Sequence, residues 1–183
     1  SGPIAKDELQ KEITAYVASI RNEAIHAITQ AFITDYEKDF YTYPAAMKNH
    51  HDFVSGLATH VLGMLHMADA LCKQYILLNR DLLIAGVILH DIGKLTVPKE
   101  ILDKPTKLTE TEWEIMKHHT DNGDELIRAA YPDVEDNTFV KVACDVVRSH
   151  HEDWDGSGYP DGLKGSDIPL LSLIHISEPT RLA

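Results

Sequence analysis

Hydrophobic positions recur every three or four residues over most of the chain, which is the spacing of helices that bury one face. Five segments show this pattern: residues 7–37, 52–75, 82–90, 109–131 and 134–150. No segment shows a convincing alternation with a period of two, the pattern of a half-buried β-strand. The sequence therefore predicts an all-α protein, a compact bundle of about five or six helices.

Local signals refine two of the boundaries. Thr109 and Glu112 have the spacing of a capping box, which starts a helix, and Trp113 then marks the inner face of that helix. Residues 96–107 contain two prolines, and residues 152–165 are rich in Gly and Asp. We expect both of these stretches to form loops.

Composition and charge limit the classes of function. A chain of 183 residues suits one domain. The net charge of -12 argues against stable binding of duplex nucleic acid through a basic surface, whereas bound cations would still attract a small phosphodiester substrate. No signal peptide or membrane-length apolar run is visible, and we expect Cys72 and Cys144 to be free thiols. We therefore expect a cytoplasmic location.

The longest apolar run ends in two polar residues. Residues 82–89 are all apolar or Gly, and His90 and Asp91 follow them directly. Burying an ionised carboxylate costs several kcal/mol unless it is paired or binds a metal. Imidazole and carboxylate groups are together good ligands for Mn, Fe or Zn. The alternative to a metal site is a hydrogen-bonded His–Asp pair in the core. Further candidate ligands elsewhere in the chain would favour the metal site.

Other histidines lie on the inward faces of the expected helices. His60, His119 and His150 each fall three or four residues from apolar stripe positions, and His151 follows at a helix end. A single such histidine is usually a hydrogen-bonded core residue, but several from separate helices are satisfied more directly by a metal centre. The candidate ligands are His60, His90, Asp91, His119, His150 and His151.

Six ligands exceed the needs of one tetrahedral zinc. They suit two six-coordinate divalent ions, with Fe or Mn favoured and Zn, Mg or Ni as alternatives. Such a pair lowers the pKa of a bridging water and binds a phosphoryl group, so we expect phosphodiester hydrolysis through a metal-bridging hydroxide. Asp91 and Lys94 are the candidate catalytic residues, with Lys94 contacting phosphate. The alternative for Lys94 is an ordinary surface lysine at a helix C-terminus.

Three stretches resemble the HD superfamily of metal-dependent phosphohydrolases, and more narrowly its HD-GYP subfamily. They are HDIGK at residues 90–94, VPKEILDKPTKLTETEWEIMKHH at 97–119 and SHHEDWDGSGYPDGLKGSDIP at 149–169. The resemblance covers residues 60–170 and implies hydrolysis of cyclic di-GMP at an Fe or Mn centre held by the six residues above. It also implies a regulatory protein partner at the Gly158-Tyr159-Pro160 loop.

Other parts of the chain depart from that subfamily. Residues 49–71 and 78–94 are similar to the HD domain of bacterial exoribonucleases that trim RNA from its 3′ end, which places a join near residues 95–97. Residues 171–183 resemble a translated sequencing adapter, so no function is assigned to His175. They stand where the HD-GYP pattern continues into a helix with another metal-ligand Asp, so the activity of this chain is expected to be weak or absent.

These features lead to a ranked set of functions and a division of the chain. The first function is a cyclic di-GMP phosphodiesterase, the second is an HD-domain 3′-end exoribonuclease or nucleotide phosphohydrolase, and the third is a non-catalytic nucleotide- or partner-binding module. We expect residues 1–50 to form a helix and linker packed on the HD domain at 51–170, with a non-native tail at 171–183. His50 and His51 are interpreted as loop residues, and a homodimer is left open.

Overall fold

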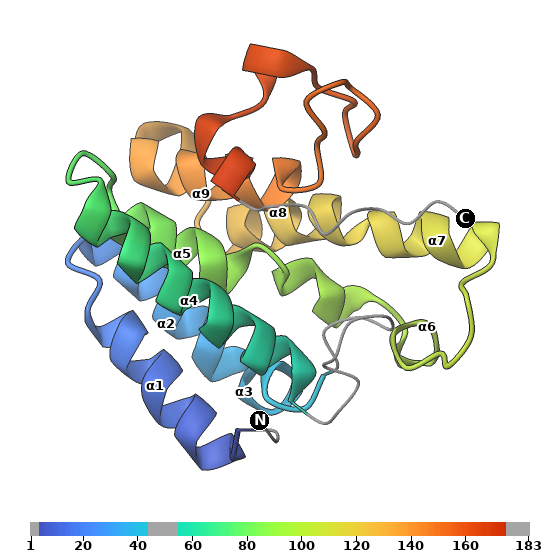
Figure 1. Cartoon of the computed structure of the whole chain (residues 1–183), viewed down its shortest axis with the longest axis horizontal. Coiled ribbons are helices and arrows are strands. Elements are labelled where there is room, and N and C mark those ends of the chain that lie inside the picture. Colours follow the sequence, from blue (N-terminus) through green and yellow to red (C-terminus); the bar gives the residue numbers. More distant parts are fainter. Residues whose placement is uncertain (1–3, 44–54, 175–183) are drawn as a thin grey trace.

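Helix α5 (Arg80–Leu89) lies at the centre of the structure, with α1, α2, α4 and α9 packed around it (Figure 1). The computed structural model describes residues 4–43 and 55–174. Every residue of α5 from Leu83 to Leu89 is buried, because the helix is surrounded on all sides. A helix that is apolar all round is the type expected in such a position.

The described residues form nine α-helices and four 3-10 helices, without a β-strand, which confirms the predicted all-α class. The α-helices besides α5 are α1 (Lys6–Ala18), α2 (Glu23–Asp35), α3 (Glu37–Phe40), α4 (Gly56–Gln74), α6 (Lys99–Leu102), α7 (Glu110–Lys117), α8 (His119–Ala130) and α9 (Thr138–Ser149). The 3-10 helices are η1 (Ile92–Thr96), η2 (Val134–Asp136), η3 (Gly165–Asp167) and η4 (Leu170–Ile174).

The helix expected over residues 7–37 is interrupted, and α1 and α2 take its place. The side chain of Asn22 accepts a hydrogen bond from the backbone N–H of Ile25 at 3.1 Å and so caps α2. The backbone N–H groups of Arg21 and Asn22 both donate to Asp81 Oδ2 at 2.9 Å. Asp81 lies at the start of α5, so a carboxylate distant in sequence stabilises the break.

The helix expected over residues 109–131 is also divided, into α7 and α8. His119 Nδ1 donates to the carbonyl of Met116 at 2.7 Å, and Thr120 Oγ1 donates to the carbonyl of Lys117 at 3.0 Å. Side-chain donors of this kind compete with the backbone hydrogen bonds that would continue a helix. The loop expected over residues 96–107 holds the single-turn helix α6, and the helix expected from residue 134 begins as η2 before α9. These differences raise the helix count above the expected five or six.

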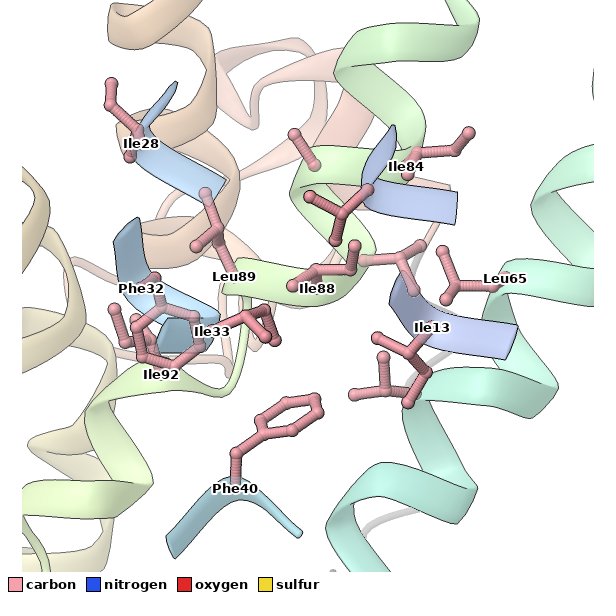
Figure 2. Close-up of a cluster of buried hydrophobic side chains, with 14 of the residues drawn as sticks. Ile13, Ile28, Phe32, Ile33, Phe40, Leu65, Ile84, Ile88, Leu89 and Ile92 are labelled. Atoms are coloured by element: carbon pink, nitrogen blue, oxygen red, sulfur yellow. The ribbon is translucent and has the colours of Figure 1, made fainter. Parts of the chain in front are cut away.

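One hydrophobic core joins the N-terminal helices to the rest of the structure. Figure 2 shows Ile13 of α1 near Leu65 of α4 and Phe32 of α2 near Ile92 of η1, with Ile88 of α5 between the two pairs. Each of these side chains is at most 5% exposed. Full burial of such a side chain contributes about 1.5–3 kcal/mol, so α1 and α2 add substantially to the stability of the helices that carry the site.

The turn after α5 approaches α8 unusually closely. A Cβ added at Gly93 would lie 1.8 Å from the carbonyl O of His119, and one added at Gly123 would lie 3.0 Å from Ile92 Cγ2 and 3.3 Å from the backbone N of Gly93. Only glycine permits this contact between backbones. Because of it, the residues that end α5 lie beside the residue that begins α8.

Two further observations concern cysteines and membranes. Cys72 and Cys144 are both free thiols, as predicted. Within residues 4–43 and 55–174, every helix is too short or too polar to cross a lipid bilayer.

Gly93→Ala is expected to lower the free energy of unfolding by about 3 kcal/mol or more, because the added methyl group meets backbone that has to move. Gly63→Ala is the matched control: no atom lies within 4 Å of the added Cβ, and Gly63 is exposed inside α4. That change is expected to stabilise the chain by about 0.5–1 kcal/mol. Urea denaturation of both variants measures the difference, and similar values for the two would contradict the close contact.

Candidate metal centre

The predicted ligands come from four separate helices and meet at one place. His60 lies within α4, His90 and Asp91 follow α5, and His119 begins α8, while His150 and His151 follow α9. His90, Asp91, His119 and His150 are each at most 3% exposed. His60 and His151 are half-buried, so the centre has a buried interior and a more open side.

Three imidazole rings are oriented in the same way. Nδ1 of His90 lies 2.7 Å from the carbonyl O of Val87, and His119 and His150 make equivalent contacts of 2.7 and 2.8 Å with carbonyls three residues earlier. A carbonyl can only accept a hydrogen bond, so Nδ1 carries the proton in each ring. This tautomer leaves the Nε2 lone pair available in a neutral ring, which is the form that binds a metal.

The carboxylate of Asp91 lies between these rings. Its Oδ1 atom is 3.6 Å from Nε2 of His119 and 3.7 Å from Nε2 of His150. Its Oδ2 atom is 3.2 Å from Nε2 of His90 and accepts a hydrogen bond from Lys94 Nζ at 2.7 Å. Asp91 is thus in contact with residues from three different elements.

The potential ligand atoms form two groups that have Asp91 in common. One group contains Asp91, His119, His150 and His151, and the other contains His60, His90 and Asp91. Within each group the ligand atoms all lie within 4.8 Å of one another. Asp91 Oδ1 is buried and accepts no hydrogen bond from the described residues. A buried carboxylate oxygen in that position fits coordination of a cation, so the cluster could hold a divalent metal.

Burial controls the protonation of the imidazoles. Burial, and after it the neighbouring His150, lower the pKa of His119 to about 3. Burial likewise lowers the pKa of His150, and it holds the pKa of His151 well below the usual value, with His150 and His119 adding to the effect. His119, His150 and His151 are therefore neutral near pH 7, as metal binding requires.

Asp91 keeps its charge in spite of its burial. Burial raises the pKa of Asp91, but the charge of Lys94 and the adjacent His90 outweigh that effect and hold the pKa well below the usual range. The side chain of Lys94 is only 13% exposed. Lys94 therefore belongs to the cluster and is not an ordinary surface lysine.

Tyr159 forms a wall of the centre, a position that the residue pattern alone did not predict. Its ring stacks on His151, with centroids 4.7 Å apart and planes 21° from parallel. Its backbone N–H donates to the carbonyl O of His151 at 3.1 Å. A Cβ at Gly158 would lie 2.2 Å from the backbone N of Asp153, so this position requires glycine. The Gly-rich stretch so soon after two histidines was the available signal for a loop that folds back over them.

Glu152 fixes the same loop and was also missed. Its buried carboxylate accepts hydrogen bonds from the backbone N–H groups of Asp161, Gly162 and Leu163, at 2.7, 3.1 and 2.8 Å. Arg148 adds two bonds to the Asp161 carboxylate, at 2.7 and 2.8 Å. The loop is held to the end of α9 by charge-assisted hydrogen bonds, which are stronger than neutral ones.

Four other histidines, His118, His50, His51 and His175, fall into two sets. His118 has a side chain that is 65% exposed and pairs with Asp121 at 3.0 Å, so it lies outside the cluster. His50, His51 and His175 lie outside the described residues.

Comparison with known proteins shows the family of the chain. Residues 57–175 match the HD domain family. The chain belongs to that family. The chain is 40% identical over 171 residues to a 3′-5′ exoribonuclease YhaM of Listeria innocua. The aligned region covers 92% of this chain and 53% of the relative. The YhaM proteins of Bacillus subtilis and Bacillus velezensis are 39% and 41% identical over similar lengths. The chain thus spans about half the length of these relatives.

These relatives correct the expected subfamily and substrate. The prediction of an HD-GYP enzyme that hydrolyses cyclic di-GMP is wrong, because the curated relatives are named exoribonucleases. Their similarity extends over 92% of the chain and so includes both sides of the expected join near residues 95–97. The HDIGK motif and the histidines supply the candidate metal ligands, and such residues do not distinguish one phosphodiester from another.

The stability of the metal-free chain is expected to fall as the pH drops from 7 to 5. An unfolded histidine takes up a proton near pH 6.5, whereas the buried ring of His119, with its pKa of about 3, does not. The stability present above pH 6.5 is therefore lost below it. Urea denaturation in EDTA at both pH values measures the loss.

His119→Asn is expected to reduce that loss by about 2 kcal/mol, because the asparagine takes up no proton in either state. His118→Asn is the control, since it replaces an exposed histidine one position away, and its pH dependence should match the original chain. An unchanged pH dependence in His119→Asn would show that the His119 ring is not buried in its neutral form.

Proposed function

We propose that this chain is the catalytic part of a metal-dependent 3′-5′ exoribonuclease, which hydrolyses the phosphodiester at the 3′ end of single-stranded RNA. The observation that carries the proposal is the buried Asp91 carboxylate placed between imidazoles from α5, α8 and α9. Family membership and the names of the relatives support the class of reaction and the substrate.

The two groups around Asp91 would hold two divalent ions, Fe or Mn, with Asp91 contacting both. His119, His150 and His151 would hold one ion, and His60 and His90 the other. Bound ions of this kind supply a water of lowered pKa and positive charge for the phosphoryl oxygens. The mixed imidazole and carboxylate ligands favour Fe, Mn or Zn over Mg, which prefers oxygen ligands.

The side chains themselves prepare the site for such a reaction. The hydrogen bonds from Nδ1 to backbone carbonyls hold the rings in place before any substrate arrives. Lys94 keeps Asp91 ionised and places a positive charge beside it. That charge would also stabilise negative charge that develops on a phosphate.

The acidity of the chain agrees with binding of a strand end. A net charge of -12 opposes broad contact with a phosphate backbone. Affinity would then be concentrated at the metal centre, where cations reverse the local field. A cytoplasmic location, a regulatory partner at the Gly158-Tyr159-Pro160 loop and a homodimer stay predictions.

Incubation of the metal-loaded chain with a 5′-labelled single-stranded RNA tests the function directly. We expect a ladder of products shortened one nucleotide at a time, no cleavage after addition of EDTA, and slower shortening of the same sequence in a duplex. Cyclic di-GMP serves as the comparison substrate and should remain intact. Internal cleavage, or no shortening with Mn or Fe, would overturn the proposal.

Asp91→Asn is expected to abolish both metal content and RNA shortening, because the amide keeps the shape of the side chain and removes its charge. The loss should exceed the roughly 10–100-fold cost of losing a group that only supports a ligand. Asp69→Asn is the control, since Asp69 pairs with Lys73 and Arg80 outside the cluster. Elemental analysis and the labelled RNA assay measure the two effects, and retained metal in Asp91→Asn would contradict the assignment.

A further inference from the structure

An aromatic surface extends outward from the metal-ligand cluster. Tyr159 stacks on His151 at 4.7 Å, and Trp113 of α7 meets Tyr159 edge to face, with centroids 6.0 Å apart and planes at 80°. Tyr159 is half-buried and Trp113 is 38% exposed. The three rings form a continuous series from the buried ligands to the solvent, which we name the aromatic shelf (His151, Tyr159 and Trp113).

The shelf is held in position before any ligand binds. Gly158 allows the loop to lie against the backbone of Asp153, and Glu152 binds three backbone N–H groups of the same loop. On the other side, a capping box formed by Thr109 and Glu112 fixes the start of α7, three residues before Trp113. A surface that is ordered in advance binds with a smaller entropic cost.

We propose that the aromatic shelf binds the base of the 3′-terminal nucleotide of an RNA strand, with the base stacked on the exposed part of Trp113. This inference rests on the proposed function and names a subsite for its substrate. Centroid separations of 4.7 Å and 6.0 Å lead from His151 through Tyr159 to Trp113. A nucleotide with its phosphate at the ligands would therefore extend its base outward along the shelf.

Stacking is also the kind of recognition that such a reaction needs. An exonuclease meets every base in turn, and all four bases have a π-face that an indole or phenol ring can contact. Hydrogen bonds to base edges would instead favour one base over another. An aromatic surface next to the ligands therefore fits a strand of any sequence.

Binding can be measured without turnover because the chain has only two tryptophans. Trp154→Phe leaves Trp113 as the sole tryptophan, and Trp113→Phe leaves Trp154 as the control. Trp154 is 64% exposed and makes no contact with another aromatic ring within the described residues. Each metal-loaded variant is titrated with a phosphorothioate-linked oligo(A) RNA that resists hydrolysis. We expect saturable quenching of the Trp113 emission and none of the Trp154 emission.

Kinetics then separate a binding role from a structural one. Trp113→Ala is expected to raise KM for RNA by about 5- to 150-fold, the range for loss of one stacked base, with a smaller change in kcat and an unchanged thermal midpoint. Trp113→Phe should recover most of the affinity, and Trp154→Ala should leave KM unchanged.

The outcomes distinguish this inference from the function on which it rests. Suppose that the chain shortens RNA, that Trp113→Ala has an unchanged KM and that the Trp113 emission is not quenched. The proposal that the shelf binds a base is then wrong, and the proposed exoribonuclease function is retained. If the oligonucleotide quenches the Trp113 emission but no RNA is shortened, base binding by the shelf is retained and the proposed exoribonuclease function is wrong. A lower kcat with an unchanged KM would also overturn the shelf, since it would assign Trp113 a role in supporting the cluster alone.

Discussion

The site depends on one electrostatic balance, the retention of a negative charge in an interior that excludes water. Asp91 is 3% exposed, and removing a carboxylate from water is costly unless positive charge lies close by. Lys94 supplies part of that charge, and the neutral rings around the other oxygen leave room for cations. The apolar sequence of α5 follows from the same requirement, because the helix has to pass through the core to bring its polar end to this position.

A second constraint is the close packing of backbone on backbone. The approach of Gly93 to the carbonyl of His119 sets the distance between the end of α5 and the start of α8. A side chain at either glycine would separate these elements and move His119 away from Asp91. The ligand arrangement is therefore a consequence of packing as much as of the ligand residues themselves.

Much of this arrangement could be predicted from the sequence, and the failures have physical causes. His60, His119 and His150 could be placed by their distance from apolar stripe positions, because helical periodicity is a local property. The break between α1 and α2 could not, since it is stabilised by Asp81, about 60 residues away along the chain. Trp113 was expected to face inward, yet it is 38% exposed, because α7 projects beyond the core. The prediction of cyclic di-GMP as the substrate was wrong because metal-ligating residues indicate a phosphodiester substrate. They carry no information about the groups attached to the phosphate.

For the exoribonuclease proposed above, the attachment of the Gly158-Tyr159-Pro160 loop has a consequence for how an RNA strand would move through the site. Releasing Glu152 would break three hydrogen bonds to a buried carboxylate, each of which is worth about 1.5–3 kcal/mol. Opening this wall at every step would be slow. A shortened strand would instead advance by sliding along fixed rings, so translocation would require no hinged movement of the protein.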